Sequence, residues 1–384
     1  MGLGRRSGIR AKGLFSRSSL FVGFLLLLQL FPALSQDKTA EERKAYALAK
    51  QQVEQLQKEG KFEEAIGACE DFLWKHPQSG ICSRGMAVLA EGILSRQIKD
   101  PETKQRIYKR AVEEFPHTTE YYALGMAGQI REALYEKRDY AKADELCRKA
   151  IENLGDRLPR DYYLGYNLYS LRVQALRYDG KAEEAIAYAR ETAALSPRML
   201  SDRGYLRAVY DSVRTTKKPD DVLSAAKLFY VLCDYTERDI KEATELAAGA
   251  LMAKGGPGAS LQFAKSQEKP DAANPLKDAP MFALGESEKL LAAAGQDPDA
   301  QLNALLVAGR MPEALKVAVD QMRDSAGKTP AGIAQALRNI ARCFKAHDLN
   351  LVRANRFLDF HRTGEGDNPL PAFEAELAKS GGAK

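Results

Sequence analysis

The sequence predicts an all-α protein built from antiparallel helix hairpins, and three observations support this fold class. Apolar residues recur at three- and four-residue intervals along most of the chain, which is the spacing of one helix face. The pattern of residues 58–79 returns near residue 140 and again near residue 182. Glycine and proline stand at the ends of these stretches, where they close a helix.

The clearest copy of the pattern is the stretch 58–79, KEGKFEEAIGACEDFLWKHPQS. Gly60 marks a turn between two helices, Ala65 begins a row of apolar residues at helical spacing, and Pro77 stops the helix. The preceding residues 39–56 also carry an apolar residue every three or four positions. They supply the first helix of the pair.

Three further helix pairs follow, and less regular helices come after them. The pairs are predicted at 79–97 with 100–116, at 118–138 with 140–154, and within 166–197, YNLYSLRVQALRYDGKAEEAIAYARETAALSP. The small alanines Ala65, Ala143 and Ala185 are 78 and 42 residues apart. Helices without a clear repeat are predicted over 202–216, 220–235 and 237–253.

This order of turn glycine, aromatic residue, small alanine, spaced apolar row and terminal proline resembles the second helix of a tetratricopeptide repeat. Steps of 39 and 42 residues are longer than the family period of about 34, and Val53 replaces the close-packing glycine of a first helix. The resemblance implies a degenerate TPR-like α-solenoid. Its helix pairs stack into a curved rod whose first helices line a concave face.

The chain divides into four parts by composition. Residues 36–254 carry the helical repeats, and residues 255–285 contain four glycines and four prolines, which predict a flexible linker. Residues 286–384 form a smaller C-terminal helical segment, in which Gly309 and Ala314 echo the repeated pattern, and whose tail frays from residue 364.

Residues 1–35 have the features of a secretory signal peptide. Five basic residues precede an apolar run over 20–30, and small residues follow it, so cleavage is expected after Ser35. The run is shorter than the roughly 20 residues of a spanning helix, although an uncleaved membrane anchor is the alternative. The protein is therefore expected to be exported, to the periplasm or the exterior of a bacterium.

Composition and charge exclude two classes. An apolar content of 45% with 28% charged residues is globular, so general disorder is excluded. The leader holds five of the 57 basic residues, and the remaining 52 match the 52 acidic residues. A neutral mature chain lacks the basic surplus of a nucleic-acid-binding protein, and contact with a membrane is expected only through an uncleaved leader.

Cysteine and histidine offer no predicted metal site or cofactor site. The five cysteines are scattered without the two-residue spacing of a metal knuckle. Cys69 and Cys147 occupy equivalent positions and are interpreted as buried apolar residues, with a Cys69–Cys82 disulfide as the alternative. His117 and Glu120 could share a helix face, but two ligands do not make a zinc site.

No catalytic residues are predicted. Residues 327–329 resemble the end of a phosphate-binding loop, yet Met322 stands where its first glycine belongs. Glu286-Ser287 resembles the catalytic pair of secreted lytic transglycosylases, but its surroundings do not. The protein is therefore predicted to be non-enzymatic.

The resemblance places polar residues of the first helices on the concave face, where they are candidates for binding a protein or peptide partner. They are Lys50, Glu54, Glu132, Tyr135, Asn167, Ser170, Gln174 and Arg177. A solvated helix face is the alternative for each of them. Tyr162, Tyr166 and Tyr169 stand at helical spacing and fit either the core or a recognition patch.

The expected function is to bind a peptide or protein segment in this groove and to assist assembly of the cell envelope. Two alternatives remain open. One is a cell-wall or carbohydrate-active enzyme with its site between the solenoid and the C-terminal segment, and the other is a structural spacer.

Overall fold

The computed structural model describes residues 40–77, 80–117, 119–155, 162–269, 272–325 and 329–381. These residues form seventeen α-helices, one π-helical turn and one 3-10 turn, and no strand occurs among them. The predicted all-α class is confirmed. The predicted leader and the last residues of the tail lie outside the described residues.

The helices follow one another with short connections. The first part contains α2 (Ala40–Lys58), α3 (Phe62–Lys75), α4 (Ile81–Arg96), α5 (Pro101–Glu114), α6 (Glu120–Arg131), the π-turn η1 (Glu132–Glu136), α7 (Tyr140–Leu154) and α9 (Tyr162–Tyr178). The middle contains α10 (Ala182–Leu195), the 3-10 turn η2 (Pro197–Ser201), α11 (Arg203–Thr215), α12 (Pro219–Leu232) and α13 (Glu237–Glu268). The last part contains α14 (Ser287–Ala294), α15 (Pro298–Val307), α16 (Met311–Ser325), α17 (Pro330–Asp348), α18 (Val352–Thr363) and α19 (Leu370–Gly381).

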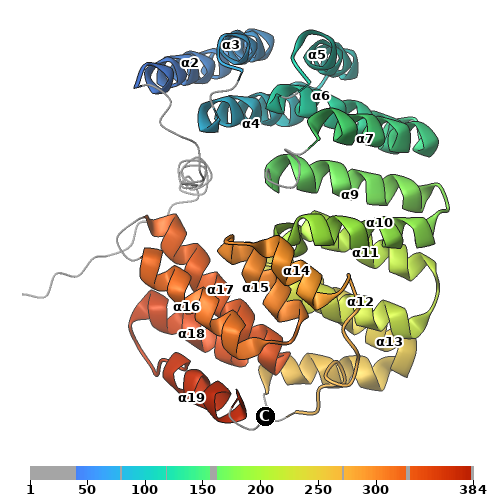
Figure 1. Ribbon diagram of the computed structural model, residues 1–384, viewed down its shortest axis with the longest axis vertical. Helices are drawn as coiled ribbons and strands as arrows, with labels where there is room; N and C mark the ends of the chain where they lie inside the picture. Colours follow the sequence, from blue (N-terminus) through green and yellow to red (C-terminus); the bar gives the residue numbers. More distant parts are fainter. Residues whose placement is uncertain are drawn as a thin grey trace, which may run out of the picture.

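Each helix packs mainly against its neighbours in sequence. Figure 1 shows α2 to α13 following a curve from the top of the view, down its right side, to the base. The helices α14 and α15 lie in the centre of the view and α16 to α19 at the lower left. Here α14 packs against α10, α15 against η2 and α12, and α17 against α12. The C-terminal helices therefore turn back onto the middle of the array.

The turn inside a helix pair repeats one backbone geometry. Gly60, Gly180 and Gly309 have positive φ angles of 75°, 78° and 68°. The amide of the next residue donates to a carbonyl five positions earlier, at 2.9 to 3.0 Å. Arg138 and Lys217 also have positive φ angles, 54° and 58°, in turns between helices, although the amide after Arg138 donates to a carbonyl six positions earlier, at 2.8 Å. A side chain in this left-handed region costs roughly 1 kcal/mol, so the backbone of these two turns is strained.

The repeated small positions form the seam between the helices of a pair. Ala65, Ala143 and Ala185 are fully buried. Cys69 is also fully buried, and burial raises the pKa of its thiol above the ordinary value. All five cysteines are free, so the alternative Cys69–Cys82 disulfide is not formed. Cysteine acts here as a small apolar side chain, as the sequence predicts.

Residues 255–285 contain more regular structure than their composition predicts. The helix α13 continues to Glu268, and only Gly256, with φ 74° and ψ −172°, leaves helical geometry. Pro257 directly follows and starts the second half of the helix, where its missing amide hydrogen is tolerated. Further on, Leu276 and Leu284 are fully buried. One glycine kink therefore replaces the irregular linker expected in the first part of this segment.

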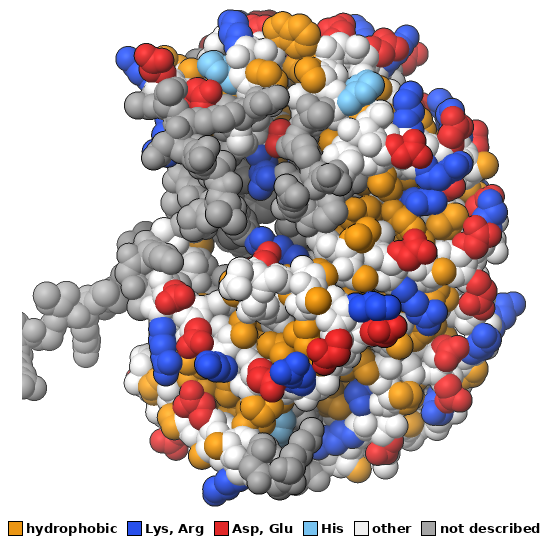
Figure 2. Space-filling model, viewed as in Figure 1, with side chains coloured by type: hydrophobic (Ala, Val, Ile, Leu, Met, Phe, Trp, Pro, Cys, Tyr) orange, Lys and Arg blue, Asp and Glu red, His pale blue; other side chains and the backbone are white. Residues whose placement is uncertain are grey.

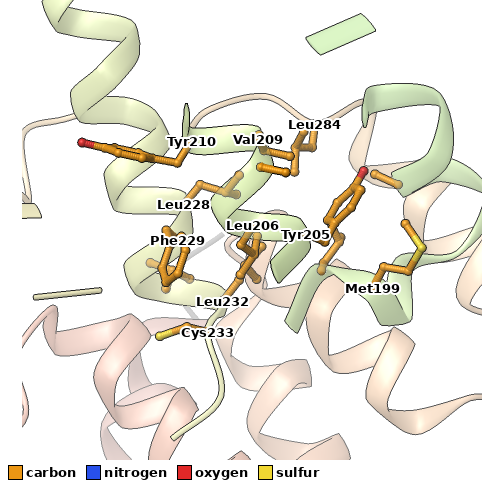
Figure 3. Packing of buried hydrophobic residues seen from close by; sticks show 14 of the residues in the cluster. Met199, Tyr205, Leu206, Val209, Tyr210, Leu228, Phe229, Leu232, Cys233 and Leu284 are labelled. Atoms are coloured by element: carbon orange, nitrogen blue, oxygen red, sulfur yellow. The ribbon is translucent and has the colours of Figure 1, made fainter. Parts of the chain in front are cut away.

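One apolar core joins the middle of the chain to its C-terminal helices, because a continuous cluster extends from Tyr122 to Leu377. Figure 3 shows part of it, with Val209 of α11 beside Leu284 of the connecting segment. A second, smaller cluster holds α2 to α5 together with the start of α6. None of the helices in the described ranges combines the length and apolar character that crossing a bilayer requires.

Candidate functional site

Five of the predicted partner-binding residues lie near one another, four of them on α9. Asn167, Ser170, Gln174 and Arg177 stand at helical spacing along α9, while residues between them, such as Val173, are fully buried in the core. The amphipathic pattern of α9 therefore turns this polar stripe away from the apolar seam. Contacts from neighbouring helices extend it in both directions.

The first extension comes from α6 and the π-turn. Arg131 Nη2 donates to Asn167 Oδ1 at 3.0 Å, and the Tyr135 hydroxyl donates to Gln174 Oε1 at 2.6 Å. Gln174 Nε2 in turn donates to Ser170 Oγ at 3.2 Å. Tyr135 lies in the π-turn, and π-turns are rare and occur often at functional sites. This position supports a functional role for the stripe on its α6 side.

The second extension is a chain of alternating charges across α9, α11 and α13. Arg177 lies 3.3 Å from Asp211 Oδ2, and Arg207 Nε donates to the same oxygen at 3.0 Å. Glu242 of α13 then accepts from Arg207 at 2.8 Å and from Arg203 at 2.6 Å. Burial alone would raise the pKa of Glu242, but the hydrogen bonds from the two guanidinium groups outweigh it and hold this pKa below its ordinary value.

We call this set the polar row. It consists of Arg131, Tyr135, Asn167, Ser170, Gln174, Arg177, Arg203, Arg207, Asp211 and Glu242. The side chains of Arg203 and Arg207 are 32% and 39% exposed, whereas those of Arg177 and Asp211 are 13% and 15% exposed. The half-buried members therefore hold the row in place, and the more exposed arginines and Tyr135 are accessible to a partner.

Three predicted residues take other places. Glu132, the first residue of the π-turn, pairs with Lys137 directly after the turn at 3.0 Å. Lys50 and Glu54 pair with each other at 3.8 Å on α2, beside a cavity of about 350 Å³ that Tyr46 also lines. The structure thus brings together Tyr135 and the four α9 residues, and it places these three elsewhere.

The sequence analysis did not predict the members of the row on α11 and α13, although the spacing of the α11 residues could have indicated them. Arg203, Arg207 and Asp211 stand four residues apart and so share one face of α11. Their pairing with Glu242 depends on how α13 approaches α11, which the repeat pattern does not reveal because it fades in this region.

The tyrosines divide between core and surface. Tyr169 is 3% exposed and belongs to the core. Tyr178 is 44% exposed, stacks on Tyr140 with ring centroids 5.4 Å apart, and has the Arg177 guanidinium 4.0 Å from its centroid. The side chains of Tyr162 and Tyr166 lie outside the part of the chain that the structure describes. A surface tyrosine cluster therefore adjoins the polar row at the end of α9.

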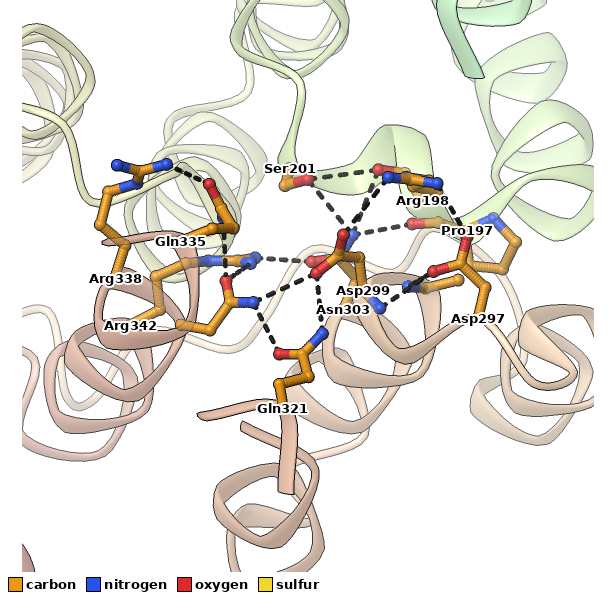
Figure 4. Close-up of polar contacts among 12 residues, drawn as sticks. Pro197, Arg198, Ser201, Asp297, Asp299, Asn303, Gln321, Gln335, Arg338 and Arg342 are labelled. Atoms are coloured by element: carbon orange, nitrogen blue, oxygen red, sulfur yellow. Dashed lines mark hydrogen bonds and ion pairs between the residues drawn. The ribbon is translucent and has the colours of Figure 1, made fainter. Parts of the chain in front are cut away.

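A second polar cluster lies where the C-terminal helices meet the middle of the array (Figure 4). Arg342, only 2% exposed, donates to the carbonyl of Leu232 at 2.8 Å and to Asn303 Oδ1 at 2.5 Å. Asn303 Nδ2 donates to the carbonyl of Pro197 at 3.0 Å. These bonds join α17, α15, η2 and the end of α12.

The same cluster contains one carboxylate at its centre. Asp299 Oδ1 accepts from Gln321 at 3.0 Å and from Asn339 at 3.1 Å, and Arg198 lies 3.4 Å from its other oxygen. This carboxylate is fully engaged in hydrogen bonds and an ion pair. The arrangement therefore fixes the orientation of α15, α16 and η2 relative to one another.

No protein-family model matches the chain, and no curated protein or solved structure matches it either. Fold and site together define an all-helical protein whose helices pack mainly in sequence order. Within the described ranges, no group of three histidine, cysteine or acidic side chains is arranged to hold a metal ion.

Proposed function

We propose that the chain is an exported, TPR-like helical-repeat protein that binds an extended peptide segment along the polar row and assists assembly of the cell envelope. The observation that carries the proposal is the row itself, because contacts between side chains run from α6 and its π-turn through α9 and α11 to α13. An extended peptide presents alternating donors and acceptors over a similar length. Amide side chains such as those of Asn167 and Gln174 can serve both kinds of group.

The charges of the row support a polypeptide partner of mixed charge. Basic and acidic side chains alternate along it and neutralise one another. Figure 2 shows the same mixture over the coloured part of this face, with no broad area of a single sign among the described residues. Such a surface favours short-range contacts with specific groups over long-range attraction of a polyanion.

The test is crosslinking in intact cells followed by mass spectrometry, with wild type compared with the triple variant Asn167→Ala, Gln174→Ala, Arg177→Ala. A stoichiometric polypeptide partner is expected for wild type and is expected to be lost in the variant. The double variant Glu184→Ala, Glu191→Ala changes exposed residues of α10 and should retain the partner. Circular dichroism confirms that all forms are folded.

Two outcomes contradict the proposal. Retention of every crosslinked partner by the triple variant would favour a spacer without a binding surface. Digestion of peptidoglycan by the purified protein would favour the alternative enzyme.

A further inference from the structure

A groove lies between α13 and α18, and side chains of both helices line it. Its volume is about 730 Å³, within the range of pockets that bind ligands. Four partly buried apolar side chains line it between the two helices: Ile240, Ala248, Leu351 and Leu358. At one end, the Tyr235 hydroxyl donates to Asn355 Oδ1 at 2.9 Å and fixes the distance between the walls.

The α13 wall carries a row of alternating charges. Glu237, Lys241 and Glu245 are exposed, line the groove and stand four residues apart, so they form one line along the helix. None of the three forms an ion pair within the described part of the chain, in contrast to the charges of the polar row. On the opposite wall Arg362 is paired with Asp359 at 2.6 Å.

We propose that this groove binds an amphipathic helix of another polypeptide. The helix would place an apolar stripe on the groove floor and a basic, acidic, basic row, with four-residue spacing, against Glu237, Lys241 and Glu245. The wall from Tyr235 to Ala248 is about 20 Å long at 1.5 Å per residue, so it accommodates three to four helical turns. Charge rows of this kind set the orientation and choice of partner helices in coiled coils. This inference is independent of the function proposed for the polar row.

A second copy of the chain is the rival occupant. On α2, Lys50, Glu54 and Lys58 have the required charge order and spacing. However, Leu48 is the only large apolar side chain that α2 leaves exposed among the described residues. A helix with one exposed leucine cannot cover a floor of four apolar side chains, so the structure favours a partner helix with a full apolar stripe.

The test uses two synthetic amphipathic peptides of about 15 residues, long enough for the groove. They share a leucine stripe and differ only in their flanking row, which is Lys–Glu–Lys in one peptide and Glu–Lys–Glu in the other. Fluorescence anisotropy should show the first peptide binding wild type at least about tenfold more tightly, since like charges oppose the second. The variant Glu237→Lys, Lys241→Glu, Glu245→Lys should reverse this preference.

Two further variants complete the experiment. Ile240→Glu places a charge on the floor and should abolish binding of both peptides, with circular dichroism checking the fold. Arg238→Glu makes the same change of charge as Lys241→Glu outside the groove lining and should leave both affinities unchanged.

Equal affinity of wild type for the two peptides, or binding that persists in Ile240→Glu, would overturn the proposal. Sedimentation of the protein alone tests the rival occupant. Self-association of wild type that disappears in Ile240→Glu would identify a second copy as the occupant and would likewise overturn the proposal.

Discussion

Asp202 should lower the stability of the fold at neutral pH even though it caps a helix. Its side chain accepts a hydrogen bond from the amide of Tyr205 at 2.8 Å and so begins α11. Burial is the main cause that raises its pKa from 3.8 to about 6; Asp239 adds to the rise, and the backbone hydrogen bonds oppose it. The folded protein therefore holds this proton more tightly than the unfolded chain does.

The sign of the effect follows from these two pKa values. Below pH 3.8 the carboxyl is protonated in both the folded and the unfolded chain, and it imposes no penalty. As the pH rises from 3.8 to 6, the unfolded chain releases the proton first, so the free energy of unfolding falls. Above pH 6 the loss is complete, and a shift of this size corresponds to at most about 3 kcal/mol.

Asp202→Asn should remove this penalty, because asparagine is neutral and is an equally good helix cap. We expect the free energy of unfolding of the variant to exceed that of wild type by about 1–3 kcal/mol at pH 7.5 and by almost nothing at pH 3.5. Urea denaturation followed by circular dichroism measures this difference. Asp100→Asn is the matched control: Asp100 caps α5 at the surface, and its hydrogen bonds from Thr103 lower its pKa. That variant should lose stability at neutral pH.

A destabilised Asp202→Asn protein at pH 7.5, or a gain of the same size at both pH values, would refute the reasoning. The first result would mean that the ionised carboxylate contributes more as a cap than its burial costs. The second result would mean that the gain in stability does not come from removing the ionisation of the Asp202 carboxyl.

Three further predictions use the same denaturation assay. Arg138→Gly should raise the free energy of unfolding by about 1 kcal/mol, because it removes a side chain from the left-handed region. Lys149→Gly in the helix α7 should lower it by about 1 kcal/mol. The same change of stability in both variants would contradict the account of the turn. Gly125→Ala should lower the free energy of unfolding by about 1–3 kcal/mol, because the new Cβ would lie 2.8 Å from the Ala111 Cβ. Gly92→Ala is the control and should raise it by about 1 kcal/mol, since no atom lies within 4 Å of its new Cβ. An unchanged stability of Gly125→Ala would show that α5 and α6 can separate. Lys345 is fully buried, and burial lowers its pKa below 10.5. The free energy of unfolding of wild type should therefore rise relative to that of Lys345→Met as the pH rises toward 10.5, because the folded chain releases the proton before the unfolded chain does. A constant difference would mean that folding does not shift the pKa of this amine.

The sequence predicted the helix pairs because their signals are local. Gly60 and Gly180 have the positive φ that the turn requires, and Ala65 and Ala143 are fully buried in the seam. Each of these residues is determined by contacts within its own hairpin or with the next one. Such signals remain readable even when the repeat length varies.

Contacts between distant parts of the chain left no comparable signal. Arg342 bonds to Leu232, which lies 110 residues away, and nothing around either residue marks this pairing. Gly256 and Pro257 indicated a break, yet they produce a kink because the proline follows the glycine at the start of a new helical half. The candidate site shows the same division: the resemblance to a helical repeat predicted the stripe on α9, while Glu242 joins it only through the packing of α13.

The two apolar clusters imply that different optical probes would report on different parts of this molecule. Trp74 is the sole tryptophan; its side chain is exposed at the end of α3, and its ring centroid lies 5.4 Å from that of Phe115, a member of the smaller, N-terminal cluster. Tryptophan emission would therefore follow the melting of α2 to α5, whereas ellipticity sums over every helix. Heating curves that coincide would show that the two clusters unfold as one cooperative unit, and an earlier emission transition would show that the N-terminal helices detach first.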